Sequence, residues 1–109
     1  MPIATINNYT LGFSYTTFTW PSSPSWTASG SWYYIDVTVS GIVGSSAPPV
    51  SNPVVTVLIP TAAKKDTLRE AWNNVVYIEC VANNTLRFYT LNTTACDALK
   101  GETIQVAGF

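Results

Sequence analysis

The sequence predicts a mainly β fold of the α+β class: one antiparallel, β-sandwich-like domain with a single short helix packed on a sheet. The chain has 109 residues, which is the length of one ordinary domain with its own core. Hydrophobic residues make up 47% of it and aromatic residues 13%, whereas only 10% are charged, so it has enough apolar surface to fold. Most segments between proline and glycine clusters alternate aromatic or β-branched residues with polar ones, and one segment has a helical pattern.

The N-terminal part, residues 1–25, is predicted to be a β segment or an arm that docks onto a partner. Aromatic and aliphatic residues alternate with polar ones from Tyr9 to Tyr15, which is typical of one or two strands with one apolar face. A segment with two prolines follows and interrupts the strand, because each proline lacks a backbone donor. Residues 26–109 are predicted to form the main β-domain.

Two strands are predicted in the middle of the sequence. Residues 32–39 alternate around Ile35, and a Ser-Gly pair ends that strand. Residues 44–53 contain three prolines and are predicted to be a loop. Residues 54–59 are apolar at nearly every position, so this strand is predicted to lie centrally in a sheet with both faces covered.

One helix is predicted over about residues 62–73. Leu68, Ala71 and Trp72 fall at positions i, i+3 and i+4 and form a narrow apolar stripe. Charged residues occupy the other side of the helix, where pairs four residues apart can interact. We therefore expect Trp72 to pack on a sheet.

Residues 75–81 and 86–91 are predicted to pair as a β-hairpin. A two-residue turn would place Cys80 opposite Arg87 and would mix apolar and charged residues on one face. We therefore expect a three-residue loop over 83–85, with one asparagine at positive φ.

This loop length also fixes the pairing and the faces of the hairpin. It places Cys80 opposite Phe88, with both side chains toward the core. Glu79 and Arg87 then lie on the outer face, as charged side chains require. A last short strand is predicted at residues 103–106.

Missing residue types exclude several classes of function. The absence of histidine excludes histidine-based catalytic triads and imidazole zinc sites, and two cysteines cannot form a four-thiolate site. No phosphate-binding glycine motif occurs, and a net charge of -1 provides no basic surface for nucleic acid. An enzyme would need carboxylates such as Asp36 and Glu79 to meet in a cleft, which their spacing does not indicate. We expect no catalytic residues, no cofactor, no metal and no nucleic-acid partner.

The sequence also predicts where the protein is made. Its first residues lack the basic segment of a signal peptide, and no apolar run approaches the roughly 18 residues of a membrane span. We therefore expect synthesis in a cytoplasm and no membrane insertion. Cys80 and Cys96 are then expected to stay reduced and to be buried as small hydrophobes.

The order of motifs over residues 26–106 is more distinctive than any one of them. These motifs are Trp26-Thr27, Trp32-Tyr33-Tyr34, residues 37–42, Pro53 with the valine run 54–58, residues 68–72 ending in Glu-Ala-Trp, the strand 75–81, the turn 82–84, the strand 86–89 and Ile104-Gln105-Val106. The ordered set resembles a domain found in tail-fibre, head-fibre and baseplate proteins of bacteriophages, especially phages of Gram-positive and gut bacteria. Residues 92–102 depart from that pattern by replacing a proline-bearing link, and residues 1–25 lie outside it.

The resemblance implies a non-enzymatic structural protein of the virion: a head-fibre, capsid-decoration or tail-fibre component made in the host cytoplasm. It implies a homo-oligomer, with a trimer favoured by analogy with fibres, that contacts other virion proteins and acts in assembly and host attachment. The alternative is a carbohydrate-binding module that uses exposed rings from the first third of the chain, which holds Trp20, Trp26, Trp32, Tyr33 and Tyr34. The candidate contacts for a glycan or a partner are Trp20, Trp26, Trp32 and Tyr33. A competing interpretation places most of these rings in the core or in subunit interfaces.

Overall fold

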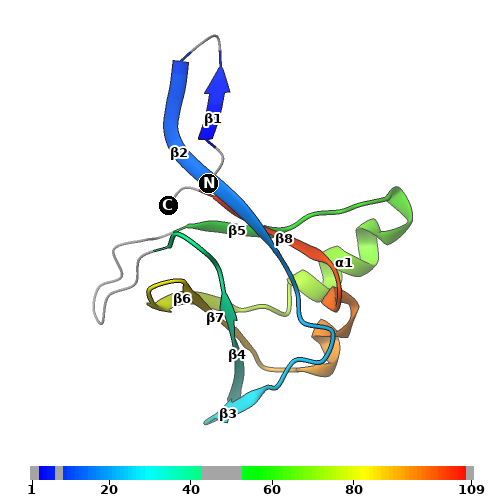
Figure 1. Cartoon of the computed structure of the whole chain (residues 1–109). Helices are drawn as coiled ribbons and strands as arrows, with labels where there is room; N and C mark the ends of the chain where they lie inside the picture. Colours follow the sequence, from blue (N-terminus) through cyan, green and yellow to red (C-terminus); the bar gives the residue numbers. More distant parts are fainter. Residues whose placement is uncertain (1–2, 7–8, 43–52, 108–109) are drawn as a thin grey trace.

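The computed structural model describes residues 3–6, 9–42 and 53–107, which form two four-stranded antiparallel sheets and a short helical layer (Figure 1). In chain order the elements are β1 (Ile3–Ile6), β2 (Tyr9–Thr19), β3 (Thr27–Ser29), β4 (Trp32–Thr38), β5 (Val54–Val57), the 3₁₀ helix η1 (Ala62–Lys64), α1 (Lys65–Trp72), β6 (Tyr77–Ala82), β7 (Thr85–Thr90), the 3₁₀ helix η2 (Thr94–Leu99) and β8 (Thr103–Ala107). One sheet has the order β1-β2-β8-β5 and the other β3-β4-β7-β6. The predicted mainly β fold with one short α-helix is confirmed. Most of the loop predicted over 44–53 lies outside the described residues.

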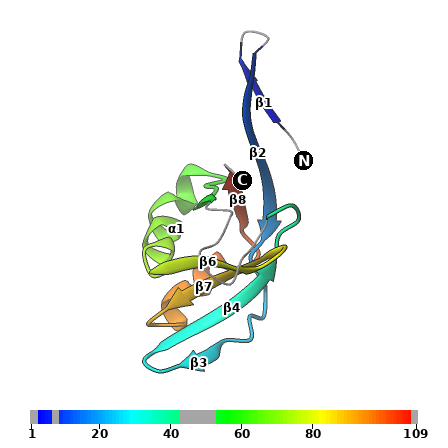
Figure 2. The same cartoon turned by 90° about the vertical axis from the view of Figure 1, so that its left-hand side faces the viewer.

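Strand β2 belongs to two different parts of the molecule. Its second half, from Tyr15 to Thr19, pairs with β8, whereas its first half pairs with β1. Figures 1 and 2 show β1 and the first half of β2 extending beyond the body as a two-stranded ribbon. Trp20, directly after β2, is 0% exposed. The described part of residues 1–25 therefore contributes both a projecting ribbon and a portion of the sheet and core.

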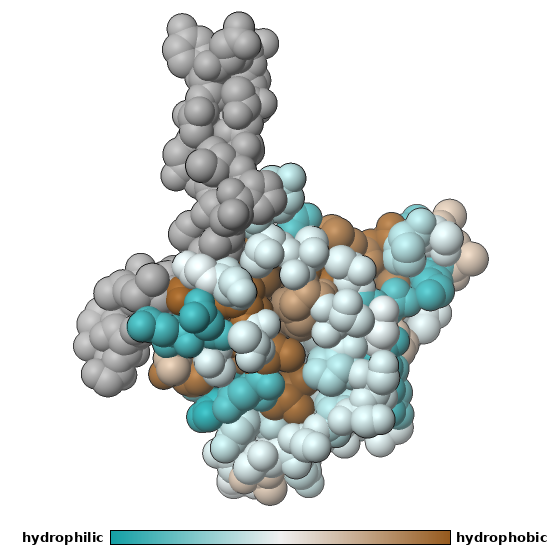
Figure 3. Space-filling view, in the orientation of Figure 1, coloured by the Kyte–Doolittle hydropathy of each residue, from teal (hydrophilic) through white to brown (hydrophobic). Residues whose placement is uncertain are grey.

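Among the described residues, strand β5 lies at the edge of its sheet and pairs only with β8. Val54 is 71% exposed, so the prediction of a central strand with both faces covered is wrong. Strand β8 lies between β2 and β5 in this sheet, and its Ile104 and Val106 are fully buried. Leu58 and Ile59 follow β5 and are also partly exposed, and Figure 3 shows apolar surface along the path from β5 to α1.

The hairpin of β6 and β7 has a two-residue turn rather than the predicted three-residue loop. Ala82 pairs with Thr85, and Asn84 between them has a φ of 63°, so the expected asparagine at positive φ is present. The pairing register shifts between Cys80 and Ala82. One extra residue is therefore accommodated in β6 as a β-bulge.

The bulge preserves the predicted faces of the hairpin, although the predicted pairing is wrong. Cys80 pairs with Leu86 and not with Phe88, yet its side chain is buried. Glu79 pairs with Arg87 on the outer face. A bulge moves the alternation of one strand by one residue, so a short turn and a consistent apolar face become compatible.

The predicted helix over about 62–73 is confirmed by η1 followed by α1. Leu68 and Ala71 are buried, which agrees with the predicted apolar stripe. The ring of Trp72 lies 6.4 Å from the rings of both Trp20 and Phe88, measured between centroids, so Trp72 packs on the sheets as predicted. The centroid of Phe88 is also 5.3 Å from that of Trp20, and these aromatic contacts join α1, β2 and β7 into one core.

Two elements were not predicted from the sequence. Strand β3 pairs with β4 across a tight turn in which Gly30 has a φ of 64°, a conformation that favours glycine. The segment between β7 and β8 forms η2, which contacts α1 and buries Cys96 and Leu99. Both cysteines are free and buried, as expected.

Candidate binding surface

The four predicted contact residues lie in different environments. Trp20 is 0% exposed, so it is a core residue and cannot reach a ligand on the surface. Its backbone explains this position, because its N–H donates to the Glu102 carbonyl and continues the β2–β8 pairing into the interior. Trp26 is partly buried and packs 6.2 Å from Trp20, measured between ring centroids. Trp32 is 38% exposed and remains a candidate.

Tyr33 is 40% exposed but faces away from Trp32. It pairs with Thr90, which is fully buried, whereas the ring of Trp32 contacts Tyr89. Successive residues of a strand point to opposite sides of the sheet. The structure therefore brings Trp32 onto the outer face of the sheet β3-β4-β7-β6 and separates it from Tyr33.

Four aromatic rings form a cluster on this outer face, which we call the aromatic cluster: Trp32, Tyr34, Tyr77 and Tyr89. Tyr89 is at its centre, with ring centroids 6.1 Å from Trp32, 5.7 Å from Tyr34 and 5.7 Å from Tyr77. Tyr34 and Tyr77 both pair with Tyr89 in the strand register, which explains the convergence of three tyrosines. The sequence prediction missed Tyr77 and Tyr89, because they become neighbours of Trp32 only through strand pairing.

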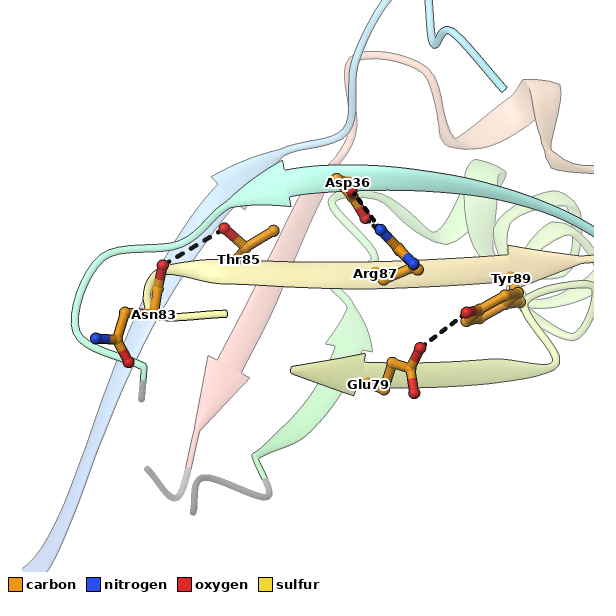
Figure 4. Close-up of polar contacts among 6 residues, drawn as sticks. All are labelled: Asp36, Glu79, Asn83, Thr85, Arg87 and Tyr89. Carbon is orange, nitrogen blue, oxygen red and sulfur yellow. Dashed lines mark hydrogen bonds and ion pairs between the residues drawn. The ribbon is translucent and has the colours of Figure 1, made fainter. Parts of the chain in front are cut away.

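Polar contacts beside the cluster connect three strands (Figure 4). Arg87 donates from Nε and Nη2 to the two carboxylate oxygens of Asp36, at 2.7 and 3.0 Å. Its Cζ atom lies 4.0 Å from the ring centroid of Tyr34. The hydroxyl of Tyr89 donates to Glu79 Oε1 at 2.8 Å. Each carboxylate is thus bound to a different residue of β7.

These contacts change two pKa values. The hydrogen bond to Asp36 raises the pKa of Arg87, so the guanidinium stays charged. Burial raises the pKa of Tyr89, and its hydrogen bond to Glu79 acts in the same direction. At neutral pH the outer face therefore has a closed ion pair and a neutral phenol that donates to a carboxylate.

The turn at one end of the outer face is held by a second group of contacts. Thr85 donates from its hydroxyl to the Asn83 carbonyl at 3.4 Å, as Figure 4 also shows. The side-chain oxygen of Asn84 accepts from the Gly41 N–H at 2.8 Å, and its carbonyl accepts from the Val39 N–H at 2.8 Å. These bonds attach the β6–β7 turn to the chain that leaves β4.

An open cavity of about 350 Å³ lies against the aromatic cluster. Its lining residues come from strands β3, β4, β6 and β7 and from the chain just before β6: Ser29, Trp32, Val76, Tyr77 and Tyr89. Three of the five are aromatic, and none carries a charge. The surface can therefore pack against a ligand and form hydrogen bonds through hydroxyl groups, without an ionic contact from the lining itself.

Two other kinds of feature are absent from the described part of the chain. No group of three or more His, Cys, Asp or Glu side chains that could hold a metal ion occurs among residues 3–6, 9–42 and 53–107. Within these residues, no helix has the length and apolar character needed to cross a membrane. Comparisons with models of protein families, with curated proteins and with solved structures gave no match.

Proposed function

We propose that this chain is a non-enzymatic structural domain of a bacteriophage particle, of the head-fibre, capsid-decoration or tail-fibre type. In this proposal it acts in particle assembly and in attachment to the host surface. The ordered resemblance of residues 26–106 to phage fibre domains supports it. The structural observation that carries it is the ribbon of β1 and the first half of β2, which extends from the body.

The ribbon suits a contact with another protein for two reasons. Among the elements of the described chain, β1 has substantial contacts with β2 alone, and a two-stranded hairpin by itself is marginally stable in water. The first 35 residues of the sequence contain no Asp, Glu, Lys or Arg, so no charged side chain opposes burial in an interface. The partners we propose are further copies of this chain, with a trimer favoured, and other virion proteins.

The oligomeric state of the purified chain tests this proposal. We expect native mass spectrometry and light scattering to give three times the protomer mass. A variant lacking residues 1–13 keeps every β2 residue that pairs with β8, and it should have the mass of one protomer. If the chain without this deletion stays monomeric at high concentration, the fibre assignment is contradicted. Its absence from purified particles analysed by mass spectrometry would also contradict the assignment.

A second candidate function is that of a carbohydrate-binding module. The observation that favours it is the uncharged cavity with aromatic walls on the outer face. Tryptophan fluorescence measured during titration with host cell-wall glycans tests it. Attachment to surface sugars would unite this candidate with the first, since a fibre domain can be both a structural part and an adhesin.

A further inference from the structure

We propose that the cavity beside the aromatic cluster binds one neutral pyranose residue of a glycan. This inference deepens the attachment role proposed above and rests on it. The cavity volume of about 350 Å³ lies at the lower end of the range for small-molecule sites, roughly 300–1,000 Å³. A site of this size suits one sugar ring rather than a long segment of a polymer.

The cavity presents two partly exposed rings for stacking. Trp32 is 38% exposed and Tyr77 is 55% exposed, and both contact Tyr89 between them. The C–H groups on one face of a pyranose carry partial positive charge and pack favourably on the negative face of an aromatic ring. Aliphatic lining, which cannot make this contact, is restricted to Val76.

Three of the residues that line the cavity carry a hydroxyl group. Ser29, Tyr77 and Tyr89 each have one, and they come from three different strands. A sugar hydroxyl that leaves water needs a replacement hydrogen-bond partner, and a hydroxyl can both donate and accept. Apolar rings and hydroxyl groups in one small cavity match the two kinds of surface that a pyranose has.

The charges near the cavity favour a neutral sugar over an acidic one. None of the five lining residues is charged, and the nearby guanidinium of Arg87 is already bound by both oxygens of Asp36. Glu79 accepts from Tyr89 and places a negative charge at the hydroxyl end of the central ring. A sialic or uronic acid would therefore meet a carboxylate without gaining a free cation.

The central ring of the site is held in place before any ligand arrives. Tyr89 contacts three other rings, and its hydroxyl is fixed by Glu79. Binding to a preformed site avoids the loss of side-chain freedom that would otherwise oppose it. The hydroxyl of Tyr89 can be tested separately from its ring, because Tyr89→Phe removes the hydrogen bond to Glu79 and keeps the aromatic ring.

The test uses the full chain and a defined set of probes: the methyl glycosides of glucose, galactose, mannose and N-acetylglucosamine, their disaccharides, and sialic and glucuronic acid. We expect saturation transfer in NMR from the protein to at least one neutral probe, with an affinity measurable by calorimetry. Trp32→Ala and Tyr77→Ala should each weaken this binding about tenfold. Tyr89→Phe should weaken it by a smaller factor.

Tyr33→Ala is the matched control, since Tyr33 is adjacent to Trp32, is similarly exposed and faces the other side of the sheet. Its binding should stay within about twofold of that of the unchanged chain, and far-ultraviolet circular dichroism should show that all four variants are folded.

The proposal is overturned if no neutral probe binds, if an acidic probe binds more tightly, or if Tyr33→Ala and Trp32→Ala lose binding equally. It is also overturned if Trp32→Ala dissociates an oligomer, which would make the cavity a protein interface. If the chain forms trimers and is incorporated into particles but binds no glycan, this inference is wrong and the proposed structural function is not contradicted.

Discussion

The two faces of strand β7 differ in what they contribute to the protein. Leu86, Phe88 and Thr90 face the interior and are 0% exposed, whereas Arg87 and Tyr89 between them face outward. The inner residues gain free energy from packing and from leaving water. The outer residues have partners that remain in contact with solvent, so their contacts orient side chains more than they stabilise the fold. The residues that hold the protein together and those that can meet a ligand are thus neighbours in the sequence.

The largest effect is expected for a change on the inner face. Phe88→Ala should reduce the free energy of unfolding by about 3–5 kcal/mol, because it leaves a cavity among Phe18, Trp20 and Trp72. Urea denaturation followed by tryptophan fluorescence measures this loss. If Phe88→Ala does not fold, Phe88→Leu should still fold with a loss of roughly 1–2 kcal/mol. Tyr89→Ala, one residue away on the outer face, should cost less than half as much as Phe88→Ala, and an equal loss would show that the two faces are not distinct.

The next largest loss of stability is expected for a change in the turn that joins β6 and β7. Asn84→Ala should cost about 1–3 kcal/mol, since an ordinary residue is strained at a φ of 63° and the bond from the Gly41 N–H is lost. Asn84→Gly loses the same bond without the strain, so its loss should be smaller. The same urea experiment compares the two variants. Equal losses would mean that backbone conformation does not matter at this position.

The faces of the strands could be predicted from the sequence because alternation is a local property. Cys80 was assigned correctly to the core, even though its partner Leu86 was not foreseen. The bulge in β6 explains this combination, since a bulge changes pairing without leaving a clear signal in composition. The prediction that β5 is a central strand was wrong for a different reason. A run of apolar residues shows that a segment avoids water, but it does not show whether a second strand covers its other edge. No strand of the described part of the chain covers that edge at Val54.

The candidate site could be predicted only in part. Trp32 was among the expected contacts, but Tyr77 and Tyr89 come from strands more distant in the sequence and meet it through the registers of β4, β6 and β7. The prediction for Trp20 was wrong in the opposite way, because it named as a surface contact a residue that lies in the core. Tryptophan is common both in cores and on binding surfaces, so its position at the end of a strand did not reveal that it would be fully buried.

A smaller effect is expected for the ion pair on the outer face. Asp36→Asn should reduce the free energy of unfolding by less than about 1 kcal/mol, because the side chains of Arg87 and Asp36 are 26% and 40% exposed. The loss should shrink further in 0.5–1 M salt, where screening is strong, with screening lengths of roughly 3–5 Å. A loss above about 2 kcal/mol, independent of salt, would show that this pair acts as part of the core.

The smallest effect near neutral pH is expected from the thiols of the interior. Burial raises the pKa of Cys80 and Cys96 above the ordinary value of 9.0, so folding favours their neutral forms. The resulting stability is complete below the pKa of the unfolded chain and is lost as the pH rises from there through the raised pKa of the folded state. We therefore expect the urea midpoint to be level from pH 7 to 8 and to fall toward pH 9.5. The double variant Cys80→Ala/Cys96→Ala should show a shallower fall over that range. An unchanged slope would assign the alkaline loss to other groups, of which Tyr89 on the outer face is one, since its pKa is also raised.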